Sequence, residues 1–248
     1  MKVDVVIPTR NEPTLSRCIK AVRENIDVNR IILVSDRENP LGDLTIILEK
    51  GNVGEARALG LQAVNTPIFA SVDSDVLVTP EWWAWAKETI MDPQNGAVQG
   101  YAAPEGNRYR TIQTNFIKRG GQFGRGFCCL GNVLLKTDIV RKVGMPTIRV
   151  GEDWELRNRI EAIGYRWVSN FDIWVPHLKS DRDVLHHSIW WGKMGGNVNY
   201  WKSLKNGLYY FAEGTLTLNQ NHLWHSLNQF CMIYGGLAGT VAKIKSEH

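Results

Sequence analysis

The apolar run Ile68–Val72 and the acidic residues after it constrain the fold of this chain more than any other stretch. Asp73 and Asp75 follow the run, one residue apart, and where a strand ends and the backbone turns both carboxylates can approach one site. Carboxylate oxygens suit Mg²⁺ or Mn²⁺, above all when a substrate's phosphates supply the remaining ligands. The stretch therefore predicts a site for a metal and a nucleotide diphosphate. The alternative is a strand-to-helix turn in which Asp75 or Thr79 only caps the next helix.

Apolar runs of strand length alternate with amphipathic helical patterns over the first part of the chain. This alternation predicts an α/β fold with a parallel, doubly wound sheet. In such a sheet ligands bind beyond the carboxyl ends of the strands, near the point where the strand order reverses. Glu12, Asp36 and Asp73 each follow a predicted strand, so we expect them at one edge of the sheet. The predicted strands cover residues 3–8, 31–34, 45–48 and 68–72, and Thr14 is expected to cap the first helix.

The pattern loosens into short strands and loops after about residue 97. The glycine-rich residues 120–126 do not form a phosphate-binding P-loop, because no Lys-Ser/Thr pair follows the glycines. After Ser180 the chain becomes rich in Trp and Tyr and predominantly helical. In between, we expect a strand at residues 130–135, a helix capped by Thr137 or Asp138, a helix opening with residues 151–156, and edge elements at 165–168 and 173–177.

Composition narrows the class of protein. The 248 residues suffice for one large domain or two small ones, and the net charge of +4 comes without a basic block that would indicate a nucleic-acid partner. The four cysteines show neither CxxC nor zinc-ligand spacing, which favours a reducing compartment. The sequence opens directly in a predicted strand, with no signal-peptide pattern and no long apolar run. These features predict a cytoplasmic protein.

Five short segments, in this order, make the chain resemble the family 2 glycosyltransferases, whose nucleotide-diphosphate-sugar-binding fold is called GT-A. The segments are residues 6–12, 52–57, 73–75, 151–156 and 176–177. The resemblance implies a doubly wound, mainly parallel sheet flanked by helices over residues 1–180. Residues 1–100 would form the nucleotide-binding half and residues 101–180 the acceptor half. Residues 181–248 would be an aromatic-rich helical extension.

The resemblance also implies which residues bind the donor. Glu12 and Asp36 would hold the ribose and base of the nucleotide, and Asp73 would face the ribose. Residues 35–38 read Ser-Asp-Arg-Glu where the family often has two Asp and a Gly-Ser, and Ala58 stands where the family commonly has Asn. The departure at residues 35–38 leaves the base, uridine or guanosine, undecided. The other matched positions of the nucleotide-sugar site are Pro8, Thr9, Asn11, Asn52, Gly54, Arg57, Ser74 and Glu152.

For the chemistry, the resemblance implies that Asp75 ligates a Mn²⁺ or Mg²⁺ ion bridging the two phosphates, with His177 as a further metal or phosphate contact. Such an ion stabilises the charge that builds on the leaving diphosphate. Asp153 would be the general base for the acceptor hydroxyl, a role that contributes about 10²–10⁴-fold, and attack opposite the leaving group would invert the sugar. Asp153 could instead serve only as a favourable charge at a helix N-terminus. His177 could be an ordinary edge residue, with His186 and His187 as rival ligands.

The sequence thus predicts a metal-dependent inverting glycosyltransferase that uses a UDP- or GDP-linked sugar and a glycan or lipid-linked acceptor. Two alternatives stay open: a non-catalytic carbohydrate- or partner-binding protein on the same fold, and a nucleotidyltransferase. Arg182 and Lys193 are candidates for neutralising the diphosphate. The Trp/Tyr-rich extension has three readings, as core, as a sugar-stacking surface, or as amphipathic helices in peripheral contact with a membrane.

Overall fold

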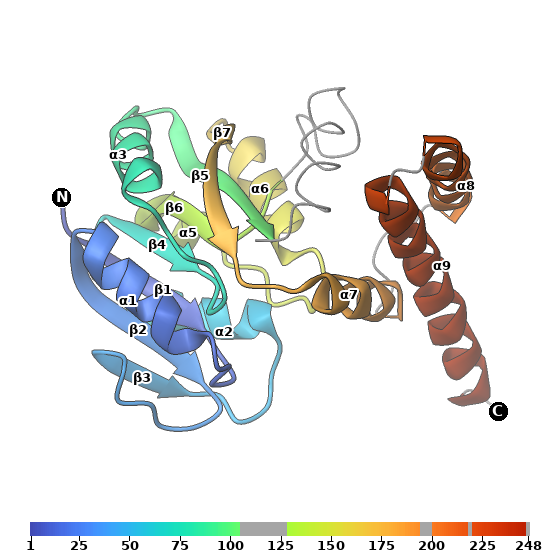
Figure 1. Ribbon diagram of the computed structural model, residues 1–248. Helices are drawn as coiled ribbons and strands as arrows, with labels where there is room; N and C mark the ends of the chain where they lie inside the picture. The colour runs from blue at the N-terminus through green and yellow to red at the C-terminus, as the bar shows by residue number, and fades with distance from the viewer. Residues whose placement is uncertain (105–127, 194–199, 218–219, 247–248) are drawn as a thin grey trace. The chain divides into compact units, whose positions relative to one another are not determined.

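The computed structural model describes residues 1–104, 128–193, 200–217 and 220–246 (Figure 1). The predicted glycine-rich loop at residues 120–126 lies outside these ranges. The chain divides into two compact units, one of residues 1–103 and 127–178 and one of residues 104–126 and 179–248. The elements of the first unit are β1 (Val3–Pro8), α1 (Leu15–Asn25), β2 (Val28–Ser35), β3 (Leu44–Ile47), α2 (Val53–Ala63), β4 (Ile68–Val72), α3 (Pro80–Thr89), β5 (Asn95–Pro104), β6 (Asn132–Lys136), α5 (Thr137–Val143), α6 (Glu152–Ala162) and β7 (Arg166–His177).

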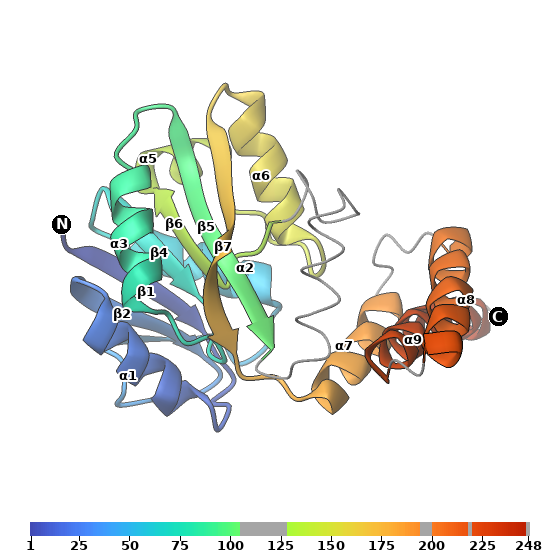
Figure 2. The same cartoon turned by 45° about the horizontal axis from the view of Figure 1, so that its top comes forward.

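The first unit is built on a seven-stranded sheet of order β3-β2-β1-β4-β6-β5-β7, whose strands are labelled in Figure 1 and seen from another side in Figure 2. Strands β1, β2, β3 and β4 form the parallel part, while β6 runs antiparallel to both β4 and β5. The predicted α/β fold with a sheet flanked by helices is confirmed, and the sheet itself is mixed. The chain moves outward from β1 to β3 and then returns to the other side of β1 with β4. The strand order therefore reverses between β1 and β4, where a ligand site is expected.

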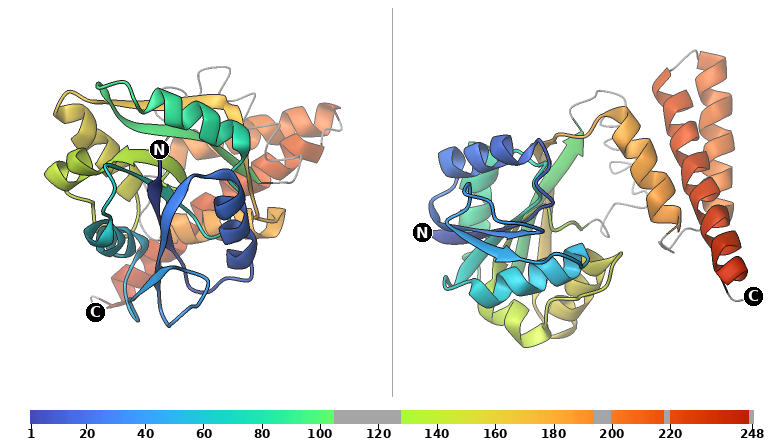
Figure 3. Two further views of the ribbon diagram at one scale, coloured as in Figure 1. Left: turned by 90° about the vertical axis from the view of Figure 1, so that its left-hand side faces the viewer. Right: turned by 90° about the horizontal axis from the view of Figure 1, so that it is seen from below.

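Helices cover both faces of this sheet (Figure 3). Alternate residues of a strand point to opposite faces, so in β1 Val5 and Ile7 belong to one buried cluster and Val6 to another. The first cluster includes apolar side chains of α1 and α3, such as Val22 and Trp82. The second includes side chains of α2, α5 and α6. The apolar runs of β1, β2 and β4 are thus buried on both sides, whereas β3 at the edge of the sheet is only half buried.

Helix caps correct part of the sequence analysis. Thr79 caps α3, because its Oγ1 accepts a hydrogen bond from Trp82 N at 3.2 Å; the alternative in which Asp75 is the cap is wrong. Thr14 precedes α1 but its side chain makes no capping hydrogen bond. The N-cap of α5 is Lys136, without a side-chain cap, so the predicted cap at Thr137 or Asp138 is wrong. The two predicted edge elements at residues 165–168 and 173–177 are one strand, β7.

The second unit consists, in the described residues, of α7 (Asp181–Lys193), α8 (Tyr200–Thr217) and α9 (Gln220–Ser246). Glycines let these helices approach closely: a Cβ on Gly207 of α8 would lie 3.0 Å from the Phe230 ring, and one on Gly214 would lie 2.9 Å from Leu223. Among the described helices, none has the length and apolar character to cross a membrane. His186, His187, Arg182 and Lys193 lie on α7 and so belong to this unit.

Candidate active site

The loop after β4 directs three consecutive side chains toward three different partners. Asp73 pairs with Arg57, Ser74 donates to Glu12, and Asp75 lies beside His177. The backbone of this loop is fixed as well, because Asp73 N donates to the Gly131 carbonyl at 3.1 Å and the Cys18 thiol donates to the Asp73 carbonyl at 3.3 Å. The acidic stretch is therefore an ordered turn at the strand-order reversal, as the sequence predicts.

Arg57 of α2 joins the Asp73 loop to the start of α6. Its Nη2 donates to Asp73 Oδ1 and its Nη1 to Glu152 Oε1, each at 2.6 Å. The arginine side chain is only 4% exposed and Glu152 only 12%. Burial alone would lower the pKa of Arg57, but Asp73 and then Glu152 outweigh burial and hold the pKa above its ordinary value. Arg57 therefore orients two carboxylates, a function that the sequence resemblance does not suggest.

Glu12 is held by the loop that follows β1. Pro8 ends β1, and Thr9 Oγ1 donates to Glu12 Oε2 at 2.6 Å while the Arg10 amide lies 3.1 Å from each carboxylate oxygen. Ser74 Oγ adds a hydrogen bond to the same Oε2 at 2.9 Å. The carboxylate of Glu12 thus connects the loops after β1 and β4, the two strands that flank the reversal point.

Asn11 links the β1 loop to the end of β2. Its backbone has a φ of 59°, a left-handed conformation that Asn adopts more readily than most residues. Its Nδ2 donates to Ser35 Oγ at 2.9 Å and to Asp36 Oδ1 at 2.8 Å, and Asn39 Nδ2 donates to its Oδ1. Glu12 and Asp36, both predicted to hold the nucleoside, are therefore carried by loops joined through one asparagine side chain.

Asp75 and His177 come together because the end of β7 pairs with the loop after β4. Leu77 N donates to the Pro176 carbonyl at 2.9 Å and Leu178 N to the Asp75 carbonyl at 2.7 Å. This pairing sets His177 Nε2 at 3.0 Å from Asp75 Oδ1, with both side chains mostly shielded from solvent. Despite that distance, the buried Nε2 has no hydrogen-bond partner.

This pair fits a divalent cation. Adjacent ligands of an octahedral ion at about 2.1 Å stand about 3.0 Å apart, which matches the separation of Oδ1 and Nε2. A carboxylate oxygen and an imidazole nitrogen are both suitable ligands for Mn²⁺, and a ligating nitrogen would not need a hydrogen-bond partner. Within the described residues no group of three or more His, Cys, Asp or Glu could hold a metal. Asp75 and His177 would thus supply two ligands, with diphosphate oxygens as the others.

Asp153 stands at the start of α6, next to Glu152. Its Oδ1 accepts a hydrogen bond from Trp154 N at 2.8 Å. Burial, and after it the charge of Glu152, raises the pKa of Asp153 to about 6, while Arg57 opposes the rise. A carboxylate with a pKa near neutrality is well suited to accept a proton from a hydroxyl.

Asn52 and Gly54 hold the loop before α6 instead of contacting the Asp73 loop. Asn52 caps α2, accepting from Glu55 N at 3.0 Å, and its Nδ2 donates to the Thr147 carbonyl at 2.9 Å. A Cβ on Gly54 would lie 2.6 Å from the Pro146 carbonyl, so only glycine permits this approach. The Asn-x-Gly motif therefore positions the segment that leads into Glu152 and Asp153.

Asp73 is supported by residues that the sequence pattern does not single out. A Cβ on Gly131 would lie 2.6 Å from Asp73 Oδ2, so the aspartate rests directly on this glycine. The fully buried Gln99 of β5 accepts hydrogen bonds from Cys129 N at 3.1 Å and from Trp167 Nε1 at 2.8 Å. These contacts hold the segment that enters β6. The signal in the sequence is Gly131, directly before β6, because a glycine at such a position often marks the close approach of another part of the chain.

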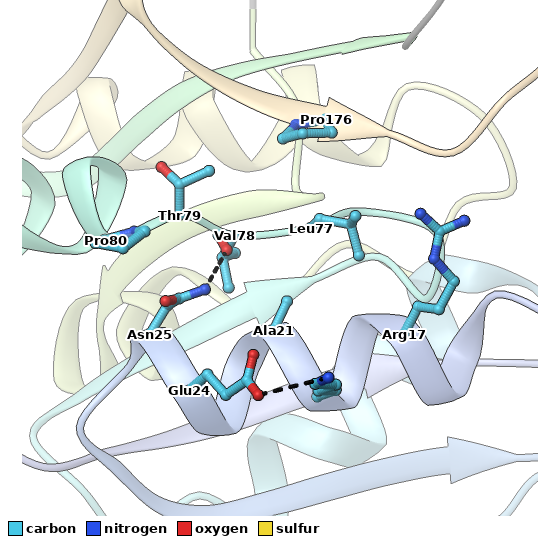
Figure 4. Close-up of a pocket in the computed structure, with 10 residues that line it drawn as sticks. Arg17, Ala21, Glu24, Asn25, Leu77, Val78, Thr79, Pro80 and Pro176 are labelled. Carbon is cyan, nitrogen blue, oxygen red and sulfur yellow. Dashed lines mark hydrogen bonds and ion pairs between the residues drawn. The ribbon is translucent and has the colours of Figure 1, made fainter.

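A hollow of about 370 Å³ lies between α1 and the loop that leads from β4 to α3 (Figure 4). Lys20 and Glu24 of α1 form an ion pair at 3.8 Å on one side, and Leu77 and Pro176 line the other. None of the predicted site residues lines this hollow in the described structure. It lies behind the strand pairing that holds Asp75 and His177, on the side of α1.

Comparison with protein families now identifies the chain. The model of glycosyl transferase family 2 matches residues 4–144, more than half of the sequence. The chain belongs to glycosyl transferase family 2. The predicted family and the predicted glycosyltransferase activity class are thereby confirmed, which favours this reading over a nucleotidyltransferase. Among curated proteins no sequence matches.

Solved structures share the GT-A fold of this glycosyltransferase. The mannosyltransferase PcManGT from Pyrobaculum calidifontis, in complex with GDP-Man and Mn²⁺, aligns with a TM-score of 0.71 and 15% identity over 97% of this chain and 87% of that one. Glucosyl-3-phosphoglycerate synthase from Mycobacterium tuberculosis, in complex with Mn²⁺, UDP and phosphoglyceric acid, aligns with a TM-score of 0.54 and 15% identity over 75% and 73%. S. aureus TarS aligns with a TM-score of 0.54 and 14% identity over 80% of this chain and 41% of that one.

Proposed function

We propose that this family 2 glycosyltransferase moves a sugar from a UDP- or GDP-linked donor to an acceptor hydroxyl, in a reaction that requires Mn²⁺ or Mg²⁺ and inverts the anomeric centre. The observation that carries the proposal is the pair of Asp75 and His177, placed beside the loops of Glu12 and Asp73 at the reversal point of the sheet. The complexes of two structurally similar proteins with Mn²⁺ and a nucleotide or nucleotide sugar support it.

The loops at the ends of β1, β2 and β4 bind the donor. Glu12 and Asp36 hold the nucleoside, since their loops are joined through Asn11. Ser74 connects Glu12 to the β4 loop. Asp73 accepts from the ribose hydroxyls with Oδ2, because Arg57 engages only Oδ1. Asp75 and His177 hold the divalent ion, which supplies electrostatic stabilisation of the leaving diphosphate when bound.

Acceptor activation falls to Asp153. Its carboxylate takes the proton of the acceptor hydroxyl as the oxygen attacks the anomeric carbon, and the bond to the diphosphate breaks on the opposite face. The pKa of about 6 leaves Asp153 ionised at neutral pH yet basic enough to take the proton. Asp153 is near Arg57 and Cys129, because its charge contributes to the pKa of both.

Residues 1–180 are the transferase domain in this proposal, with a nucleotide-binding half up to residue 100, and residues 181–248 are an extension. The acceptor is a glycan or a lipid-linked molecule. We place the protein in the cytoplasm, where nucleotide sugars would reach the site, and at the inner face of the membrane when the acceptor is lipid-linked. Four free thiols agree with a reducing compartment.

A thermal-shift measurement with UDP and GDP, with and without Mn²⁺, tests the donor and metal assignments. A ligand at about 100 times its Kd stabilises the native state by about 2.7 kcal/mol, which corresponds to about 5–11 °C in Tm for a domain of this size. We expect this shift for one nucleotide in the presence of Mn²⁺, and we expect Asp75→Ala to abolish both the Mn²⁺-dependent shift and sugar transfer.

The matched control is Asp172→Asn, which alters an exposed aspartate of β7 that takes no part in the site. This variant should keep the full shift and full activity. If Asp75→Ala retains a Mn²⁺-dependent shift equal to that of the unaltered protein, the metal assignment is wrong. If neither nucleotide shifts Tm under any condition, the donor assignment is wrong as well.

A further inference from the structure

Exposed apolar side chains are concentrated in the helices of the second unit. Of the sixteen large hydrophobic residues that are exposed in the described structure, nine lie in α7, α8 and α9. On α8, Trp201 is 82% exposed and Leu216 85%, and Leu208 and Tyr209 are each more than half exposed. Such a concentration of exposed apolar surface indicates a binding surface, whereas single exposed apolar residues do not.

These residues share one face of α8 with an exposed lysine. At about 100° per residue, the five positions fall within an arc of about 100°. We call this face the α8 stripe. It consists of Trp201, Lys205, Leu208, Tyr209 and Leu216.

The opposite face of α8 packs against α9. Ser203, Gly207 and Gly214 are buried there, and Ser226 Oγ of α9 donates to the Gly207 carbonyl at 2.7 Å. Phe230 lies against Gly207. The hairpin of α8 and α9 therefore has its own interior, and the α8 stripe is directed away from it.

The charges of this hairpin are almost all of one sign. Residues 200–246 contain four lysines (Lys202, Lys205, Lys243 and Lys245) and a single acidic residue, Glu213. Glu213 Oε2 lies 3.5 Å from His222 Nδ1, so this carboxylate faces the inside of the hairpin. The exposed face thus combines Trp, Tyr and Leu with positive charge and carries no compensating acid.

We propose that the α8 stripe docks on the surface of a lipid bilayer that contains anionic lipids. Trp and Tyr side chains favour the interfacial depth of a bilayer, and lysines beside them pair with lipid phosphates. A second copy of the chain is a poorer occupant, because a symmetric dimer would bring this face against itself and oppose Lys205 with its own copy. The proposal deepens the proposed function, since a lipid-linked acceptor would be presented at the same surface.

Vesicle co-sedimentation of the full chain tests the proposal. Vesicles of phosphatidylcholine are compared with vesicles that contain about 30% phosphatidylglycerol, which gives the surface a negative potential. We expect binding to the anionic vesicles and weakening by added salt. Trp201→Ser/Leu216→Ser should bind at least tenfold more weakly, and Lys205→Glu several-fold more weakly. Met91→Ser, at a 63% exposed methionine outside the second unit, should bind like the unaltered chain.

Three results would overturn the proposal. The first is vesicle binding by Trp201→Ser/Leu216→Ser or by Lys205→Glu that equals that of the unaltered chain. The second is no binding of the unaltered chain to either kind of vesicle. The third is a dimer in sedimentation velocity that the double variant dissociates, which would make a second copy the occupant. Hydrolysis of the nucleotide sugar in solution separates this proposal from the transferase proposal. The variants of the α8 stripe should keep this hydrolysis. If neither the unaltered chain nor the variants hydrolyse the nucleotide sugar, only the proposed transfer chemistry is refuted.

Discussion

Replacing Asp153 by Asn should make the protein more stable and inactive at the same time. The folded structure raises the pKa of this carboxyl from an ordinary value of 3.8 to about 6, mainly through burial. At about 1.4 kcal/mol per pKa unit, ionised Asp153 costs the folded state about 3 kcal/mol. Asn removes this cost while its Oδ1 can still accept the hydrogen bond from Trp154 N.

The sign of the pH dependence follows from proton binding. Between pH 3.8 and about 6 the folded state holds a proton on Asp153 that the unfolded chain has released. This contribution to stability therefore falls as pH rises through that window. Asp153→Asn should exceed the unaltered protein by up to about 3 kcal/mol near pH 8 and match it within about 0.5 kcal/mol near pH 4. Urea denaturation at both pH values measures the difference through the midpoint and m value.

Activity provides a second readout of the same carboxyl. Transfer by the unaltered protein should rise with pH, reach half its maximum near pH 6 and level off above about pH 7. Asp153→Asn should lose about 10²–10⁴-fold in rate while keeping its nucleotide-dependent thermal shift. Asp172→Asn should resemble the unaltered protein in stability and rate. The assignment of a buried, proton-accepting Asp153 would be wrong if Asp153→Asn were no more stable than the unaltered protein near pH 8. It would also be wrong if the rate of the unaltered protein did not change between about pH 5 and 7.5.

Two further changes test the contacts around Asp73. Arg57→Met leaves Asp73 and Glu152 without their buried partner, a change that typically lowers the free energy of unfolding by about 3–5 kcal/mol. Because Asp73 is one-third exposed, we expect the lower end of this range. Calorimetry should then show a decrease of about 6–12 °C in Tm. The control is Arg159→Met, which removes an exposed ion pair with Glu155 and should lower the free energy of unfolding by less than about 1 kcal/mol. An equal loss of stability in both variants would contradict the role of Arg57 as a buried partner. Gly131→Ala places a methyl group 2.6 Å from Asp73 Oδ2, so nucleotide affinity measured by calorimetry should fall at least tenfold; an unchanged Kd would show that Asp73 does not contact the nucleotide.

The parallel half of the sheet was predictable from the sequence for a physical reason. Strands buried on both faces appear as uninterrupted apolar runs, and β1, β2 and β4 each show one. The ends of those runs predict that Glu12, Asp36 and Asp73 lie at one edge of the sheet. The other half gave weaker signals, because β7 is a half-buried strand whose polar middle divided it into two predicted pieces.

The partners of the acidic residues could not be predicted from the sequence. Arg57 lies 16 residues from Asp73 and 95 residues from Glu152, and nothing in the local pattern indicates that one guanidinium joins both. The role of Gln99 could not be predicted either, because a polar residue in a strand normally marks an exposed position. Gln99 is fully buried, and hydrogen bonds from Cys129 and Trp167 satisfy its side-chain oxygen. Such contacts depend on strand order, which local periodicity does not encode.

The arrangement of the β4 loop couples donor binding to acceptor activation in the proposed reaction. Asp73 reaches α6 through Arg57, and α6 begins with Glu152 and carries Asp153. A nucleotide that draws Asp73 toward its ribose would weaken the pull of Asp73 on Arg57, and Arg57 would then bind Glu152 more strongly. Stronger neutralisation of Glu152 reduces its repulsion of Asp153 and lowers the pKa of the base. The base should therefore be more fully ionised with donor bound than without it. The pH at which transfer reaches half its maximum should accordingly lie lower for kcat, which reports the donor complex, than for kcat/KM.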